Sequence, residues 1–167
     1  PELVVRSAQV HALMPMMQFS VAPWRVLPNE MAQYCLDAAK LHSKFGGEIL
    51  TKAQDAARTG EPIVRSLSWS WPGLGYERVT DQFMLGDRIY VAPVITQGAT
   101  ERAVELPAGR YFPLLGGPAR EGGAFTVAAP LEEIPAWVPA GAMLPMLTDD
   151  VDTVVGTVTD DRDVWLW

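Results

Sequence analysis

The sequence contains a single cysteine, Cys35, among its 167 residues, so the chain cannot form an intramolecular disulfide bond. It is also poor in basic residues, because 13 Lys and Arg stand against 20 Asp and Glu, giving a net charge of −7. With no basic stripe to neutralise phosphates, nucleic acids and anionic membranes are not expected as partners. No apolar run is long enough to span a bilayer. The lack of disulfides leaves the compartment open, because many secreted bacterial enzymes lack them too, and a bacterial, periplasmic or extracellular location is one expectation.

Carboxylates are absent from one long stretch, since no Asp or Glu occurs between Leu3 and Asn29. Within it, the segment Ala12–Arg25 (ALMPMMQFSVAPWR) is an apolar run that ends in Gln18 and Ser20 before Pro23 and Trp24 break it. Strands of a (β/α)8 barrel end in this way, with polar side chains facing the substrate. The pattern predicts a short buried strand at residues 16–19.

The residues on either side of this strand have helical periodicity. Apolar residues near one face predict a helix over Glu2–Leu13, which Pro15 ends. A second pattern, repeating every three or four residues, predicts one long helix from Asn29 to Arg58, with Gly60 as its C-terminal stop. Gly46 and Gly47 lie inside this helix and predict a kink or the close approach of a neighbouring element. The sandwich predicted after Gly60 can cover part of its long apolar stripe, and the rest needs a partner, for which the remainder of a barrel is the obvious candidate.

After Gly60 the composition changes to proline, glycine, tryptophan and short β-branched runs. Short strands separated by turn signals such as Pro107-Ala108-Gly109 and Gly122-Gly123 predict an antiparallel sandwich. The expected strands are Ile63–Trp69, Arg88–Val94, Ala103–Leu106, Ala124–Ala128, Ala136–Pro139, Val151–Val158 and a last one within Asp163–Trp167. The predicted fold is therefore an α/β part, the last β/α units of a TIM barrel, followed by an all-β antiparallel sandwich. Residues 1–60 form the first part, 61–150 the sandwich, and 151–167 a linker and the start of a further, truncated β domain.

Two stretches carry a resemblance to a known family. Glu2–Arg25 resembles the end of the catalytic barrel in glycoside hydrolase family 31, the α-glucosidase and α-xylosidase family, where a helix with Arg-x-x-Gln leads into the last strand. Gly60–Val94 resembles the segment that follows that barrel, including Asp-Gln-Phe-Met-x-Gly and a strand ending Ala-Pro-Val. Val104–Gly109 (VELPAG) and Ile134–Pro145 (IPAWVPAGAMLP) match in the same order.

The resemblance implies a retaining α-glycosidase that acts on α-glucosidic or related O-glycosidic bonds of oligo- or polysaccharides. The family carries its nucleophile and its acid/base on earlier barrel strands, so no catalytic residue is assigned to this chain, which is expected to be inactive as a fragment. The family's final strand often bears arginine and histidine, which fall on Gln18 and Ser20 here. Gln18, Ser20 and Trp24 are therefore the candidate substrate-binding residues. In the alternative interpretation Gln18 and Ser20 form hydrogen bonds with loop backbone groups, and Trp24 packs between the loop and the long helix.

Other residues are given structural roles. The resemblance implies that Asp81, in the motif Asp-Gln-Phe-Met-x-Gly, holds a strand-to-strand turn rather than acting as a catalytic acid. Trp69, Trp71 and Tyr76 form an aromatic patch that suits core packing more than sugar binding. His11 and His42 are isolated, so neither a metal nor another cofactor is predicted. The acidic end fits a solvated linker, with calcium binding as the alternative, and consists of Asp149, Asp150, Asp152, Asp160, Asp161 and Asp163.

A second class of function is left open. The chain could be a non-catalytic carbohydrate-binding or accessory β-sandwich module with a helical preface. The segment Ala12–Arg25 favours the enzyme interpretation, because a barrel-like strand end has no role in an isolated binding module.

Overall fold

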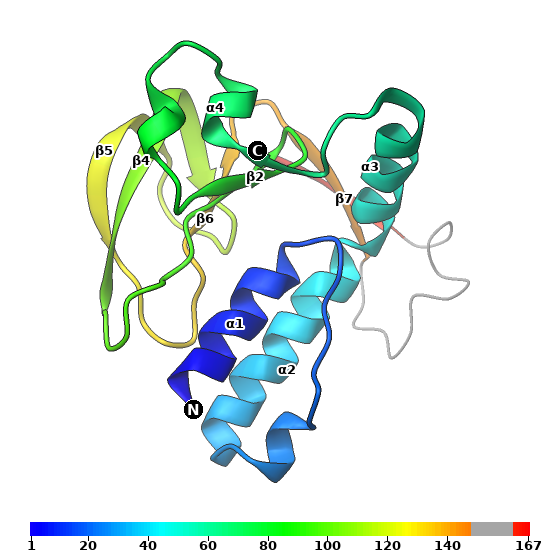
Figure 1. Cartoon of the computed structure of the whole chain (residues 1–167), viewed down its shortest axis with the longest axis vertical. Helices are drawn as coiled ribbons and strands as arrows, with labels where there is room; N and C mark the ends of the chain where they lie inside the picture. Colours follow the sequence, from blue (N-terminus) through cyan, green and yellow to red (C-terminus); the bar gives the residue numbers. More distant parts are fainter. Residues whose placement is uncertain (148–161) are drawn as a thin grey trace. The chain divides into compact units, whose positions relative to one another are not determined.

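A computed structural model describes residues 1–147 and 162–167 of the chain, with the side chains of 162–165 excepted (Figure 1). The expected strand Val151–Val158 and the acidic residues between 149 and 161 lie outside the described residues. The chain divides into two compact units. The first comprises Pro1–Ile63 with Leu144–Trp165, and the second comprises Val64–Met143 with Leu166–Trp167.

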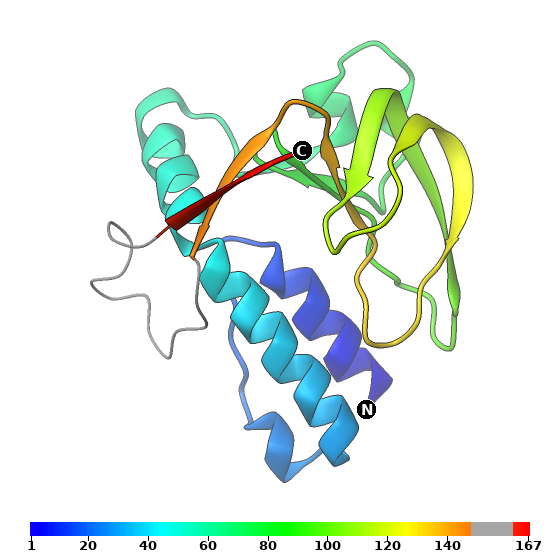
Figure 2. The ribbon, with the colours of Figure 1, turned by 180° about the vertical axis from the view of Figure 1, so that it is seen from behind.

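The first unit is built on two long helices that lie side by side, α1 (Glu2–Ala12) and α2 (Asn29–Lys44). Both run in the same direction, because the segment between them returns along their length (Figures 1 and 2). Their shared core contains the fully buried Val5, Ala12 and Cys35. The His42 ring adds a polar contact, since its Nδ1 lies 3.1 Å from the carbonyl oxygen of Ala12. The helix predicted over Glu2–Leu13 is thereby confirmed.

The returning segment is not the strand that the sequence predicts. Residues 16–19 have no regular structure, and the one element between α1 and α2 is the 3-10 turn η1 (Pro23–Arg25). The physical reason is that a strand is defined by hydrogen bonds to a neighbouring strand, and no strand pairs with this segment among the described residues. Of the predicted order helix, strand, helix, the structure has the two helical parts but not the strand.

The predicted long helix is also interrupted. It consists of α2 and α3 (Gly46–Thr59), and Phe45 separates them with φ −90° and ψ 2°. Gly46 and Gly47 weaken the helix at this point, and burial of the Phe45 side chain fixes where the chain bends. Gly60 ends α3 in the left-handed conformation, φ 80°, as predicted.

The second unit is a six-stranded sheet in which every pairing is antiparallel. Its spatial order is β1 (Val64–Ser66), β2 (Phe83–Leu85), β3 (Ile89–Val91), β6 (Ala136–Pro139), β4 (Glu101–Pro113) and β5 (Arg120–Ala128). Two short helical turns, α4 (Leu67–Ser70) and η2 (Tyr76–Arg78), connect β1 to β2. A separate two-stranded sheet pairs β7 (Met143–Leu147) with β8 (Arg162–Leu166). The antiparallel part of the predicted fold is therefore confirmed.

Individual strands differ from the prediction in length. The strand expected over Ile63–Trp69 ends at Ser66, because the Ser66 hydroxyl accepts a hydrogen bond from the Trp69 backbone N–H and caps α4. Ala136–Pro139 has the predicted bounds, whereas β3 is shorter than Arg88–Val94. The strands β2 and β7 were not predicted. Among the described residues, no helix is both long and apolar enough to cross a membrane.

Pro107-Ala108-Gly109 and Gly122-Gly123 are not turns between strands. They face each other inside one paired ladder, in which Leu106 pairs with Gly123 and Arg110 pairs with Glu121. Three residues of β4 thus oppose Gly122 alone, which makes an enlarged β-bulge. Pro107 lacks the N–H that an uninterrupted ladder would use, so the bulge accommodates it while both strands continue. Figure 2 shows β4 and β5 as long, curved neighbours.

Candidate functional site

The three candidate sugar-binding residues lie on the segment between α1 and α2. Gln18 and Ser20 are exposed on irregular backbone, and Trp24, within η1, is 75% exposed. Pro23 begins η1, where a fixed φ suits the first helical position. None of the three side chains makes a hydrogen bond within residues 1–147 and 162–167, so the capping role is not seen there. The three groups offer an amide, a hydroxyl and an indole, which can bind sugar hydroxyls and a sugar face but cannot transfer protons at neutral pH.

Asp81 forms an ion pair with Arg102. Its Oδ2 lies 2.7 Å from Nη2 of Arg102, whose side chain is only 12% exposed. Arg102 also donates from Nε to the Pro93 carbonyl at 2.8 Å and from Nη2 to the Asp81 carbonyl at 2.9 Å. The Arg102 guanidinium thus links the loop before β2 to the loop after β3. This agrees with the structural role predicted for Asp81.

Gln82 forms a second set of hydrogen bonds to β3 and β4 that the sequence did not reveal. Its buried Oε1 accepts the Glu105 backbone N–H at 3.0 Å and lies 2.9 Å from the Tyr90 hydroxyl. The Tyr90 hydroxyl also reaches the Glu105 carbonyl oxygen, and it can donate its one proton to either acceptor. Burial first, and the Glu105 carboxylate second, raise the pKa of Tyr90, so the phenol stays protonated at every ordinary pH. Asp81 and Gln82, just before β2, are therefore both joined to β4 by polar contacts.

Asp81→Asn should lower stability by about 1–2 kcal/mol, because it leaves the largely buried Arg102 guanidinium with neutral acceptors only. Solvent screening at the partly exposed Asp81 carboxylate limits the loss to this range. Thermal unfolding followed by circular dichroism should show a fall in Tm of about 2–8 °C. Asp87→Asn is the matched control, because Asp87 is exposed and lies 3.9 Å from Arg88 Nε. Equal Tm values for the two variants would contradict the structural role of the Asp81–Arg102 pair.

The aromatic patch is divided by the fold. Trp71 and Tyr76 meet edge to face at 6.1 Å between centroids, and both pack against the buried cluster around Tyr90 and Trp137. Trp69 is 54% exposed and stays outside that cluster. The core-packing interpretation therefore holds for Trp71 and Tyr76.

The two histidines lie apart, with His11 exposed on α1 and His42 against the end of α1. Within the described part of the chain, no group of three His, Cys, Asp or Glu residues has the arrangement to hold a metal ion. The structure thus offers sugar-compatible side chains on one segment and structural carboxylates elsewhere.

Comparison with known proteins identifies the class of protein. Residues 60–144, which contain the six-stranded sheet and the contacts of Asp81 and Gln82, match the glycosyl hydrolase family 31 C-terminal domain. The chain therefore belongs to glycoside hydrolase family 31.

Curated relatives support this membership over more of the chain. The myogenesis-regulating glycosidase of Mus musculus is 42% identical over 111 residues, which cover 66% of this chain and 16% of that protein. The isomaltosyltransferase of Sporosarcina globispora is 27% identical over 175 residues, covering 94% of this chain and again 16% of the relative. This chain thus spans about one-sixth of the length of these relatives.

Solved structures agree with the fold. A family 31 dextranase from Flavobacterium johnsoniae, complexed with isomaltotriose, matches with a TM-score of 0.81 at 30% identity. The matched region covers 87% of this chain and 19% of the dextranase chain. A family 31 α-xylosidase from Xanthomonas citri matches with a TM-score of 0.83 at 28% identity. The matched region covers 98% of this chain and 18% of the xylosidase chain.

Proposed function

We propose that this chain acts as part of a retaining α-glycosidase that hydrolyses α-glucosidic or related O-glycosidic bonds of oligo- or polysaccharides. The observation that carries the proposal is the family match over residues 60–144. Relatives named as α-glucosidases, an α-xylosidase and a glucan 1,3-α-glucosidase point to the same substrate class. In this function residues 61–150 are the supporting sandwich and 151–167 begin a further β domain.

Residues 1–60 are proposed to be the last β/α units of the catalytic barrel. Support comes from the parallel course of α1 and α2 around a returning segment (Figure 1). Large apolar side chains also remain exposed in this unit, notably Leu3 at 80%, Met16 at 71% and Leu36 at 49%. Exposed large apolar side chains on α1, on α2 and on the segment between them fit a unit that packs against further protein. The remainder of the barrel would supply both a strand partner for residues 16–19 and a cover for these side chains.

Gln18, Ser20 and Trp24 are proposed to form one wall of the sugar pocket. Their exposure and their lack of hydrogen bonds within the described residues leave all three available to a substrate. Active sites of barrel enzymes lie at the C-terminal ends of the strands, where this segment would end. The wall would bind and orient sugar hydroxyls, while the nucleophile and the acid/base come from other strands.

Replacing Ser20 by leucine in the full-length glycosidase should reduce kcat/KM about 100-fold, because the added bulk would displace the sugar from its reactive position. Ser20→Ala should cost only about 0.5–1.5 kcal/mol of transition-state binding, the worth of one neutral hydrogen bond. Steady-state kinetics with an aryl α-glucoside measure both effects.

The control for added bulk is Val21→Leu, which enlarges the neighbouring exposed position without touching the proposed wall. It should leave kcat/KM within about twofold of the parent enzyme, a difference well below the 1.4 kcal/mol of a tenfold change. If Ser20→Leu and Val21→Leu behave alike, Ser20 does not line the sugar site.

A further inference from the structure

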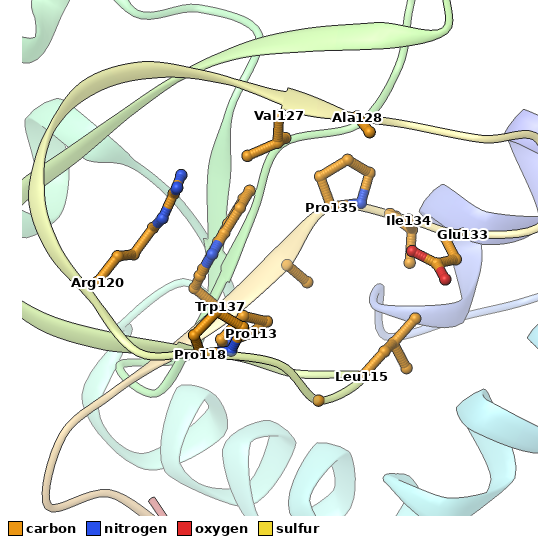
Figure 3. Close-up of a pocket in the computed structure, with 12 residues that line it drawn as sticks. Pro113, Leu115, Pro118, Arg120, Val127, Ala128, Glu133, Ile134, Pro135 and Trp137 are labelled. Carbon is orange, nitrogen blue, oxygen red and sulfur yellow. The ribbon is translucent and has the colours of Figure 1, made fainter.

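The second unit contains a pocket that the proposed catalytic function does not use. Its volume is about 230 Å³, and it lies where the ends of β4 and β5 meet the segment that leads into β6. Figure 3 shows Arg120 at one end, Glu133 at the other, and Pro113, Pro118, Pro135 and Trp137 between them. The pocket thus combines apolar walls with one positive and one negative group.

The Arg120 side chain is held in place by stacking. Its guanidinium carbon lies 3.7 Å from the centroid of the Phe125 ring, and Phe125 in turn meets Trp137 edge to face at 5.8 Å. Nη1 of Arg120 is buried and has no hydrogen-bond partner among the described residues. A desolvated donor without an acceptor is unfavourable, so an oxygen atom entering the pocket would gain more from this guanidinium than from a hydrated one.

The charges of the lining favour a neutral ligand rich in hydroxyl groups. A hydroxyl oxygen accepts a hydrogen bond from the guanidinium, and a second hydroxyl donates to the Glu133 carboxylate. A simple anion would satisfy Arg120 but would face the negative charge of Glu133. The C–H face of a sugar ring also suits walls made of proline and tryptophan. The volume is below the roughly 300–1,000 Å³ of most ligand pockets, which favours a single ring.

From these contacts we infer that the pocket between Arg120 and Glu133 is a non-catalytic binding site for one neutral sugar unit of a saccharide. The guanidinium donates to one hydroxyl oxygen, Glu133 accepts from another hydroxyl, and Trp137 with the prolines contacts the ring. The choice of an α-linked glucose saccharide as ligand rests on the proposed function. The site lies on the sheet of the second unit and takes no part in bond cleavage.

The experiment is a titration of the ¹⁵N-labelled 167-residue chain with isomaltose, followed by NMR. Saturable shifts are expected for the amides of residues 119–121, 133, 134, 136 and 137 and for the Trp137 indole N–H. Arg120→Met should weaken the affinity at least tenfold, while its thioether keeps a contact with Phe125 and so preserves the fold. Glu133→Ala, at an exposed position, should weaken it several-fold and serves as the second variant.

Arg110→Met is the matched control, because Arg110 also lies over an aromatic ring, Phe112, at 5.9 Å but is exposed and lines no part of this pocket. It should leave the affinity unchanged. The inference is overturned if isomaltose gives no saturable shifts at these signals up to its solubility limit, or if the shifts persist with equal affinity in both variants. Binding of sodium acetate or glycine here in place of the sugar would likewise overturn it, in favour of an anion or zwitterion site.

This outcome is separable from the fate of the proposed function. Binding by the isolated chain requires no catalytic carboxylate, so shifts at Arg120 and Trp137 would stand even if the Ser20 test failed. Conversely, shifts confined to residues 18–24 would support the proposed sugar wall while contradicting the pocket site.

Discussion

Gly122→Ala is expected to destabilise the second unit by about 3 kcal/mol or more, one of the largest effects available from a single methyl group in this chain. A Cβ atom at position 122 would lie 1.8 Å from the Pro107 carbonyl oxygen and 2.7 Å from its carbonyl carbon. Both are backbone atoms of the bulge in β4, so neither can rotate away as a side chain could. Thermal or urea unfolding of the full chain should show the loss, with Tm lower by about 6–12 °C or more.

Gly123→Ala separates the clash from backbone strain. Gly123 has φ +138° but open space around its Cβ position, so alanine there should cost only the strain of an unfavourable φ, about 1–3 kcal/mol. If Gly122→Ala proves no more destabilising than Gly123→Ala, the close approach of β5 to the bulge is wrong, and the ladder between Leu106 and Arg110 needs another register.

The predictions that held depend on local chemistry. The helix over Glu2–Leu13 could be read from its periodicity, and Gly60 from the left-handed residue that helix ends prefer. Ala136–Pro139 was predictable because it is a short apolar run in a stretch with the composition of a β-sandwich. In each case the residues that determine the structure are close to one another in the sequence.

The predictions that failed depend on distant partners. Residues 16–19 have the composition of a buried strand, but composition cannot supply the neighbouring strand that its hydrogen bonds need. Pro107-Ala108-Gly109 has the chemistry of a turn, yet β5 provides a partner on both sides of it and converts the turn into a bulge. Proline and glycine occur both in turns that end a strand and in bulges within a strand, so the local sequence does not distinguish the two.

The candidate site shows the same division. The structural role of Asp81 followed from the resemblance, whereas its partner Arg102 lies 21 residues further on and carries no local signal. The joint use of Gln82 by Tyr90 and the Glu105 backbone likewise needs strands to be brought together first. Gln18, Ser20 and Trp24 remain predicted substrate contacts, supported by their exposure.

The second large effect concerns catalysis by the chain alone. A retaining glycosidase needs a nucleophile and an acid/base whose carboxyl groups lie about 5–5.5 Å apart. The proposed sugar wall lies in a stretch without any carboxylate between Leu3 and Asn29, and Asp81 and Glu105 are engaged by Arg102 and Arg78. The chain alone should therefore lack the 10⁶-fold or greater acceleration, at least about 8 kcal/mol, that enzymes provide.

The most direct test of this account is the rate at which the purified 167-residue chain releases nitrophenol from 4-nitrophenyl α-glucoside, measured beside the full-length glycosidase. We expect turnover by the full-length protein and a rate equal to the buffer blank for the chain alone. Turnover by the chain that co-purifies with it and is abolished by Asp81→Asn, while the variant stays folded, would place the chemistry in the second unit and contradict the account.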